Sequence, residues 1–217
     1  MKIMKNLIGL FALTLIMSFS PAGFAAGEYN AEGKYKRIKP ARPLEQGGKV
    51  EVVEVFWYGC PHCFSFLPHL QAWEHSTMPD YVELRRLPAI FRDSWAVHAR
   101  AYYTAEVLNK ADELHVAIFN AMHGEQRALN SREEIKQFFV EHGVDTAEFD
   151  TAYDSFAVDA KTRTSEVMPR RWGVQGTPSV IVNGRYLISG RTAGSYDDLI
   201  KVLDVLVERE AAADSGS

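Results

Sequence analysis

The clearest pattern of apolar and polar positions begins at Glu51–Trp57, an apolar run rich in β-branched and aromatic side chains. Such a run, followed closely by Gly59, is typical of a buried strand. Farther on, the apolar positions change to helical spacing at Phe64, Phe66, Leu67, Leu70 and Trp73. The pattern predicts a buried strand, a tight turn, and a helix that begins near residue 60.

A second strand is predicted over Tyr81–Leu87, and the 90 residues from Pro88 to Thr177 then contain no strand signal. This stretch is far longer than a crossover helix needs, so we expect an inserted helical subdomain. Two capping signals mark helix starts, at Ser131-x-x-Glu134 and Asp145-x-x-Glu148. The expected helices are Ala96–Leu108, Leu114–Met122, one from Ser131 to Gly143, and one from Asp145 with Phe149, Ala152, Tyr153 and Phe156 on its inner face; Pro169 should kink or end that helix or a following one.

The C-terminal part has the pattern of a hairpin and a last helix. Asn183-Gly184 is a two-residue turn signal between the apolar runs 179–182 and 185–188. Ser195-x-x-Asp198 caps a helix with Leu199, Val202, Leu203 and Leu206 inward. We also expect a short edge strand at Tyr35–Ile38 and a flexible tail at 211–217.

Residues 1–25 have the pattern of a secretory signal peptide, with Lys2 and Lys5 ahead of an apolar stretch from Leu7 to Phe19. That stretch is too short for a comfortable membrane span. Small residues place cleavage near Ala25. Export would bring the chain into an oxidising compartment, where a cysteine pair can work as a disulfide.

Composition and net charge are consistent with one exported domain and favour no further class of partner. The 217 residues carry a formal net charge of −4, and removal of residues 1–25 leaves 22 basic against 28 acidic residues, about −6. No basic cluster stands out, so nucleic acid is not an expected partner. About 190 mature residues suit one domain with an insert.

The two cysteines of the chain, Cys60 and Cys63, lie at the predicted helix start. Pro61 is tolerated in a first turn. Unpaired N–H groups and the helix dipole would stabilise a thiolate at Cys60, and a protonated His62 would add to this effect. Cys63, one turn later, should be the buried resolving partner. A Cys-x-x-Cys on a strand–turn–helix predicts a redox site that needs no cofactor besides its own disulfide.

The run from Val53 to Gly59, the Cys-Pro-His-Cys that follows, and Thr177-Pro178 downstream resemble the DsbA family of bacterial periplasmic thiol oxidases. The resemblance extends from about Tyr35 to about Glu208. It implies an α/β, thioredoxin-like fold with an inserted α-helical subdomain, divided into 26–92, the insert 93–168, and 169–210.

In function, the resemblance implies donation of a Cys60–Cys63 disulfide to exported, unfolded proteins with free thiols, through a mixed disulfide at Cys60. It implies reoxidation by a DsbB-like, quinone-linked membrane oxidase. It also implies a cis Thr177–Pro178 bond that faces the cysteines and binds client backbone. A well-known member has Val at the position of Thr177, and isomerases of the same fold have Thr, which leaves redox potential and partner choice open.

Two acids of the central strand have opposite parity and should point to opposite faces. Glu51, near the strand's start, is expected to reach water. Glu54 sits mid-strand, where a carboxylate is costly unless paired or protonated. Either Glu54 faces solvent on a half-exposed sheet, or it lies beneath the cysteines and relays the proton of Cys63. The family has an acid at the matching place, which favours the relay.

Other readings of the cysteine pair remain. A structural disulfide would close a four-residue ring and stabilise by only about 2 kcal/mol, and a zinc site would need two more ligands. An isomerase or reductase of the same fold is the nearest alternative, although about 34 residues before Cys60 leave no room for the isomerases' dimerisation domain, so we expect a monomer. A chaperone or binding module, in which the cysteine pair is only structural, is a further alternative. The insert's histidines have no metal-ligand spacing and are interpreted as surface or packing residues: His98, His115, His123 and His142.

Overall fold

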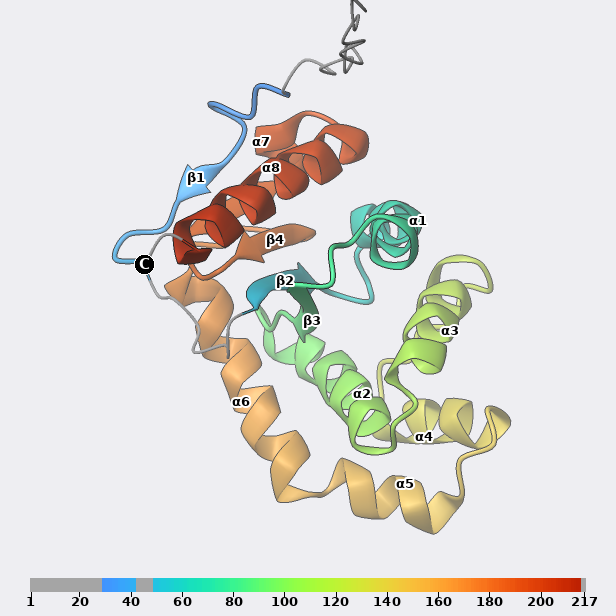
Figure 1. The fold of residues 1–217 in the computed structure, drawn as a ribbon. Coiled ribbons are helices and arrows are strands. Elements are labelled where there is room, and N and C mark those ends of the chain that lie inside the picture. Colours follow the sequence, from blue (N-terminus) through green and yellow to red (C-terminus); the bar gives the residue numbers. More distant parts are fainter. Residues whose placement is uncertain (1–28, 42–48, 216–217) are drawn as a thin grey trace, which may run out of the picture.

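The computed structural model describes residues 29–41 and 49–215 (Figure 1). The predicted signal peptide, residues 1–25, lies outside the described residues. One sheet is formed in the order β1-β5-β4-β2-β3. Its strands are β1 (Lys36–Arg37), β2 (Val50–Phe56), β3 (Val82–Pro88), β4 (Ser179–Val182) and β5 (Tyr186–Ser189).

Strand β2 lies inside the sheet, parallel to β3 and antiparallel to β4. All seven of its residues are buried, which explains why its sequence reads as one apolar run and not as an alternation. The predicted edge strand is confirmed as β1, which pairs only with β5. The predicted hairpin is confirmed as well, because Asn183 and Gly184 have φ values of 50° and 61°, as a tight two-residue turn requires.

Helices cover both faces of the sheet (Figure 1). On one face, α1 (Pro61–Ser76) and α8 (Tyr196–Ser215) share a core with β2, β4 and β5. On the other, residues after α6 (Phe156–Arg171), chiefly Trp172 and Val174, pack on the second side of β2. A short helix, α7 (Gly190–Ala193), joins β5 to α8. The central strand is therefore enclosed by apolar contacts, and the thioredoxin-like α/β architecture is confirmed.

Helices fill the long stretch between β3 and β4, as the missing strand signals predict. They form a block at one side of the sheet in Figure 1. Its aromatic core, with Phe119, Phe139 and Phe149, also contains both cysteines, so the helical block packs directly on the cysteine pair. After a 3-10 turn at Asp93–Trp95, the helices are α2 (Ala96–Val107), α3 (Ala111–His123), α4 (Arg132–Glu141), α5 (Thr146–Tyr153) and the first turns of α6.

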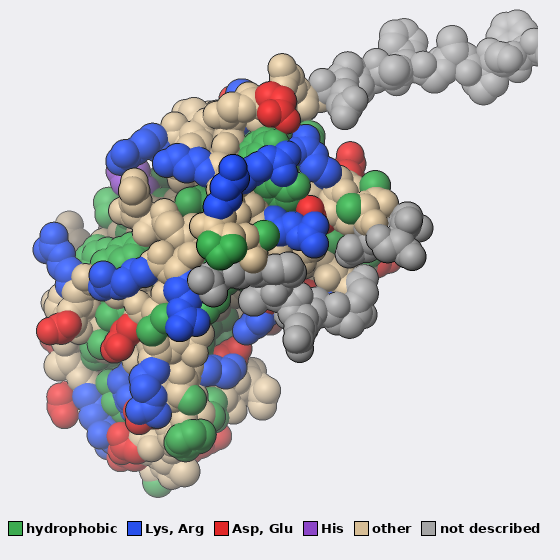
Figure 2. Space-filling view, turned by 90° about the vertical axis from the view of Figure 1, so that its left-hand side faces the viewer, with side chains coloured by type: hydrophobic (Ala, Val, Ile, Leu, Met, Phe, Trp, Pro, Cys, Tyr) green, Lys and Arg blue, Asp and Glu red, His purple; other side chains and the backbone are tan. Residues whose placement is uncertain are grey.

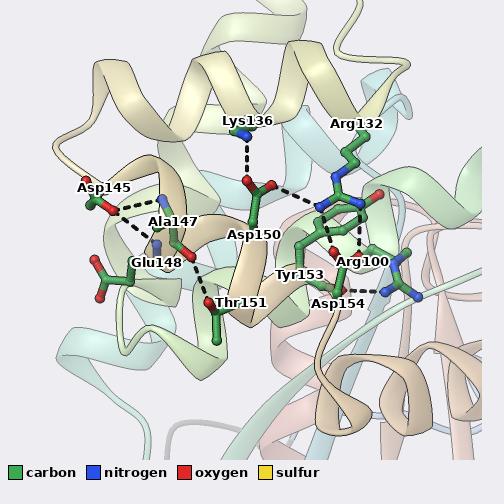
Figure 3. Close-up of polar contacts among 10 residues, drawn as sticks. All are labelled: Arg100, Arg132, Lys136, Asp145, Ala147, Glu148, Asp150, Thr151, Tyr153 and Asp154. Carbon is green, nitrogen blue, oxygen red and sulfur yellow. Dashed lines mark hydrogen bonds and ion pairs between the residues drawn. The ribbon is translucent and has the colours of Figure 1, made fainter.

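Ion pairs fix how α4, α5 and α2 lie against one another (Figure 3). Asp150 of α5 accepts hydrogen bonds from Lys136 and Arg132 of α4 at 2.6 and 2.9 Å. Arg132 also donates to Asp154 at 2.7 Å, and Arg100 of α2 donates to the last backbone carbonyl of α5. Exposed pairs contribute little free energy each, so this network orients helices whose stability comes from the aromatic core.

One expectation about the helical block is wrong. Phe156 was expected on the inner face of the helix from Asp145, but that helix ends at Tyr153 and Phe156 is 81% exposed. The reason is a second cap: the Ser155 hydroxyl accepts from the N–H of Val158 and starts α6. Pro169, expected to kink or end a helix, lies buried in the last turn of α6, which ends at Arg171.

Two expectations about charged residues and the chain end are also wrong. Glu51 does not reach water; it is fully buried and accepts from Arg85 of β3 at 2.6 Å. The expected tail is helical as far as Ser215, and Glu210 in this last part is buried and accepts from Asn183 at 2.7 Å. Residues 216–217 lie outside the described part. Within residues 29–41 and 49–215, no helix has the length and apolar character to cross a membrane.

The capping box of α4 gives a direct test of the fold. The Ser131 hydroxyl accepts from the N–H of Glu134 at 3.2 Å, and the Glu134 carboxylate accepts from the N–H of Ser131 at 3.0 Å. Ser131→Ala should lower the free energy of unfolding by about 1 kcal/mol, measured by urea unfolding. Ser131→Thr keeps the acceptor and should keep most of the stability; equal losses in both variants would contradict the cap.

Candidate active site

Cys60 lies where β2 leads through residues 57–59 into α1. Its backbone is extended, with φ −93° and ψ 113°, and Pro61 is the first helical residue. The Cys60 carbonyl accepts from the N–H groups of Cys63 and Phe64 at 3.0 and 3.2 Å. This geometry places the sulfur at the positive end of the helix dipole, beside N–H groups that lack intrahelical partners. The predicted strand, turn and helix start are confirmed.

The surroundings of Cys60 favour its thiolate. Both cysteines are free thiols, with Cys60 8% exposed and Cys63 fully buried. The hydrogen bond from the Cys63 thiol is the main cause that lowers the pKa of Cys60 to about 5, against burial, which raises it. The Thr177 side chain and the backbone of His62 and Cys63 lower this pKa further. At neutral pH, Cys60 is therefore a thiolate, the form that reacts.

Cys63 behaves in the opposite way. Burial, followed by its hydrogen bond to Cys60, raises the pKa of the Cys63 thiol well above its ordinary value. Cys63 therefore keeps its proton while Cys60 has lost one. This division fits the roles expected from the sequence, with Cys60 as the reacting sulfur and Cys63 as the more buried resolving partner.

His62 and Pro61 are exposed on the first turn of α1. The backbone of His62 helps lower the pKa of Cys60, whereas its ring lines an open groove beside the site. The Tyr196 hydroxyl, at the start of α8, donates to the His62 carbonyl at 3.0 Å and lies 3.5 Å from His62 Nδ1. Tyr196 thus ties α8 to the redox turn, a contact that the sequence analysis missed because the partners are 134 residues apart.

Thr177 and Pro178 lie against the cysteine pair, although they are more than a hundred residues away in sequence. The Thr177–Pro178 bond is cis, as predicted. The Cys60 thiol lies 3.4 Å from the Thr177 carbonyl oxygen. The N–H groups of Gly176 and Thr177 make no hydrogen bond to another described residue. These N–H groups are free to pair with a peptide segment in extended conformation.

Three histidines of the helical block hold the segment that leads into Cys60, and sequence analysis assigned them no role. His98 Nδ1 accepts from the Trp57 indole N–H at 2.9 Å. His115 Nδ1 lies 3.2 Å from the Tyr58 hydroxyl, and His123 Nε2 donates to the Tyr58 carbonyl at 2.8 Å. These partners lie 41 to 65 residues apart in sequence, so no local pattern reveals them. His142 instead bonds within α4, to the Phe138 carbonyl.

Burial keeps two of these three histidines, His98 and His115, electrically neutral. Burial lowers the pKa of His98, and it lowers that of His115 well below its usual range. With His98 Nδ1 accepting from Trp57, its other nitrogen, Nε2, is free to donate to the Leu129 carbonyl at 3.1 Å. Trp57 also stacks on Trp95, with ring centroids 3.9 Å apart. His98 and His115 therefore support the turn before Cys60 as neutral groups.

Glu54 is fully buried on the face of β2 that carries Phe56, so the solvent-facing alternative is wrong. Arg86 Nε of β3 lies 3.4 Å from its carboxylate, and the same guanidinium also pairs with Glu74 of α1. Burial nevertheless raises the pKa of Glu54 to about 7, because Arg86 opposes this effect only in part. Among the described residues, no hydrogen bond joins Glu54 to either cysteine.

The Cys63–Cys60 hydrogen bond makes a sharp prediction. Cys63→Ala should raise the pKa of Cys60 above about 5 because it removes the strongest stabiliser of the thiolate. Cys63→Ser keeps a donor and should leave the pKa nearer to 5. The measurement is the alkylation rate of Cys60 against pH in both variants. A Cys63→Ala profile that matches that of the unmodified protein would show that Cys63 does not set this pKa.

The raised pKa of Glu54 predicts a pH-dependent stability. The folded-state pKa, about 7, lies above the ordinary value of 4.5. The stability that this group contributes is therefore present below pH 4.5 and lost as pH rises through 7. The glutamine in Glu54→Gln does not titrate, so the unfolding free energy of this variant should fall less between pH 4.5 and 8 than that of the unmodified protein. The difference between the two falls should be at most about 3 kcal/mol. Urea unfolding of both proteins from pH 4.5 to 8 measures this; parallel curves would refute the raised pKa.

Known proteins share this arrangement. Residues 85–199 match the family described as DSBA-like thioredoxin domain. The chain is 36% identical over 210 residues to the thiol:disulfide interchange protein DsbA of Pseudomonas aeruginosa, covering 97% of this chain and 99% of that protein. It is 37% identical over 205 residues to the DsbA of Azotobacter vinelandii, covering 94% and 93%.

Solved structures agree. The crystal structure of Pseudomonas aeruginosa DsbA matches with a TM-score of 0.80 and 36% identity, over 88% of this chain and 98% of that one. The oxidoreductase DsbA of Xylella fastidiosa matches with a TM-score of 0.76 and 33% identity, over 82% and 96%. The similarity covers nearly the full length of the chain, and the structure places a cysteine pair at a helix start beside a cis-proline. The chain therefore belongs to the DsbA family of thioredoxin-fold thiol:disulfide oxidoreductases.

Proposed function

We propose that the protein is a periplasmic oxidase that donates a Cys60–Cys63 disulfide to newly exported proteins with free thiols. The observation that carries this proposal is the asymmetry of the two thiols, with the pKa of Cys60 lowered to about 5 and that of Cys63 raised. A stabilised Cys60 thiolate favours the reduced enzyme and makes Cys60 a good leaving group. A disulfide between these sulfurs therefore tends to oxidise its partners.

The chemistry proceeds in two exchanges. A client thiolate attacks the Cys60 sulfur of the oxidised enzyme, and Cys63 leaves with the electron pair and takes up a proton. A second client thiolate then attacks the client sulfur of the mixed disulfide, and Cys60 leaves as a thiolate. The client loses two electrons and the enzyme gains them. The dithiol form of Cys60 and Cys63 is the product state of the enzyme.

The Thr177 side chain and the first N–H groups of α1 stabilise the departing Cys60 thiolate. The open backbone before Pro178 holds the client strand beside it. Glu54 completes the proposal as the group that relays the proton of Cys63. Its pKa of about 7 suits both uptake and release near neutral pH, and its neighbour Phe56 shares one core with both cysteines.

The cellular setting is part of the proposal. The signal-like residues 1–25 support export, and the family resemblance supports the periplasm and reoxidation by a DsbB-like, quinone-linked membrane oxidase. We expect the protein to act as a monomer. The relatives that cover nearly the whole chain are themselves named as thiol:disulfide interchange proteins.

The second candidate function is that of an isomerase or reductase of the same fold, and the residue that favours it is Thr177. Its hydroxyl supports the Cys60 thiolate and occupies the position at which isomerases of the fold carry Thr. A zinc protein would need two ligands besides the cysteines, and in the described part of the chain no three His, Cys, Asp or Glu side chains are grouped to hold a metal.

Redox equilibrium separates these candidates. The Cys60/Cys63 couple, titrated against reduced and oxidised glutathione, should stay mostly reduced until oxidised glutathione is in clear excess, because the Cys60 thiolate is stabilised. Cys60→Ala should lower oxidation of a reduced client to the uncatalysed rate while the protein remains folded by circular dichroism. A strongly reducing couple would instead support the reductase, and residual turnover in Cys60→Ala would place the chemistry elsewhere.

A further inference from the structure

The groove beside the redox turn has a distinct electrostatic character. It is open, has a volume of about 590 Å³, and is lined by His62, Thr177 and Pro178 at its redox end. Such a volume lies in the range of ordinary ligand sites. Its charged lining consists of Lys36 of β1 and Arg191 of α7, with no Asp or Glu among the lining residues.

The side chains of Lys36 and Arg191 are available for a partner. Both residues are exposed, and neither side chain makes an ion pair or hydrogen bond with another described residue. Nearby cations differ: Lys34 and Lys201 both pair with Asp198, and Arg185 pairs with Glu210. Within the described part of the chain, neither groove cation is therefore neutralised by an ion pair.

The shape of the groove leaves room for client side chains. Gly173, Gly176 and Gly194 all line it, and a Cβ built on any of them would meet nothing within 4 Å. Leu187, opposite Lys36 in the β1–β5 pair, adds apolar surface. A client segment that pairs with the backbone before Pro178 thus continues into a cavity lined by glycines, Leu187 and two cations.

The positive charge at the groove contrasts with the negative net charge of the whole chain. The chain carries a net charge of −4, so its long-range field attracts basic partners. Figure 1 places β1 on the side of the molecule that faces the viewer in Figure 2, where Lys and Arg side chains gather over the upper part of the surface. Folding produces a basic region here, although the sequence analysis found no basic cluster.

We propose that this groove is a client subsite that selects an acidic side chain, Asp or Glu, on the same segment as the client's reactive cysteine. Lys36 and Arg191 bind the carboxylate while Cys60 forms the mixed disulfide with the neighbouring cysteine. This inference rests on the proposed oxidase function and names the class of client that the site prefers. One or two exposed ion pairs correspond to a preference of about threefold to tenfold.

Two synthetic dithiol peptides test the inference. They share one sequence with two cysteines and differ only in Glu or Lys at the positions flanking the first cysteine. The oxidised enzyme at low salt should oxidise the Glu peptide with about threefold to tenfold higher kcat/KM. The double variant Lys36→Gln/Arg191→Gln should lose this preference, and 0.5 M salt should weaken it in the unmodified enzyme.

Arg37→Gln is the matched control. It removes a positive charge from the same strand, but Arg37 does not line the groove and its guanidinium lies over the Tyr186 ring at 5.3 Å. This variant should keep the preference for the Glu peptide. The redox equilibrium of each variant with glutathione should match that of the unmodified protein, which verifies that the redox site is intact.

The outcomes separate the two proposals. Equal rates for both peptides, or an equal loss of preference in Arg37→Gln and the double variant, would overturn the acidic subsite and leave the oxidase function standing. A double variant that retains full preference would do the same. If neither peptide is oxidised, the proposed oxidase function fails and the subsite with it.

Discussion

The hydrogen bond from the Cys63 thiol to the Cys60 thiolate is the interaction on which the site depends. It needs one sulfur at the helix N-terminus and a second sulfur one turn later, buried behind it. Burial alone would raise both pKa values. Because the donor is the neighbouring thiol, the same burial that keeps Cys63 protonated lets it stabilise Cys60. The opposed pKa shifts are two consequences of one contact.

Two parts of the fold keep this contact in place. Strand β2 is buried on both faces and fixes the start of the redox turn. His98 and His123 of the helical block hold Trp57 and Tyr58, and burial leaves His98 neutral. A charged histidine there would alter the field at the sulfurs, whereas a neutral one supplies rigidity alone. The insert therefore supports the chemistry without taking part in it.

Sequence patterns were sufficient wherever the cause is local. The redox turn, the Ser131 cap and the Asn183-Gly184 hairpin each depend on residues within a few positions of one another, and each is confirmed. The failures have non-local causes. Glu51 is buried because Arg85 of the adjacent strand pairs with it, and no pattern within β2 contains that information. Tyr196 and the supporting histidines escaped notice for the same reason.

The groove and the redox turn differ in the same way, because the redox turn is formed mostly by residues close together in sequence and the groove by residues far apart. Oxidation requires only two sulfurs and their nearest donors, all within a short stretch apart from Thr177. Discrimination among clients requires surface that extends beyond the reacting atoms, and Lys36 and Arg191 reach it from positions more than 150 residues apart. A substitution at either position changes the charge of the groove without touching the sulfurs, so client preference can change in this fold while the redox chemistry stays the same.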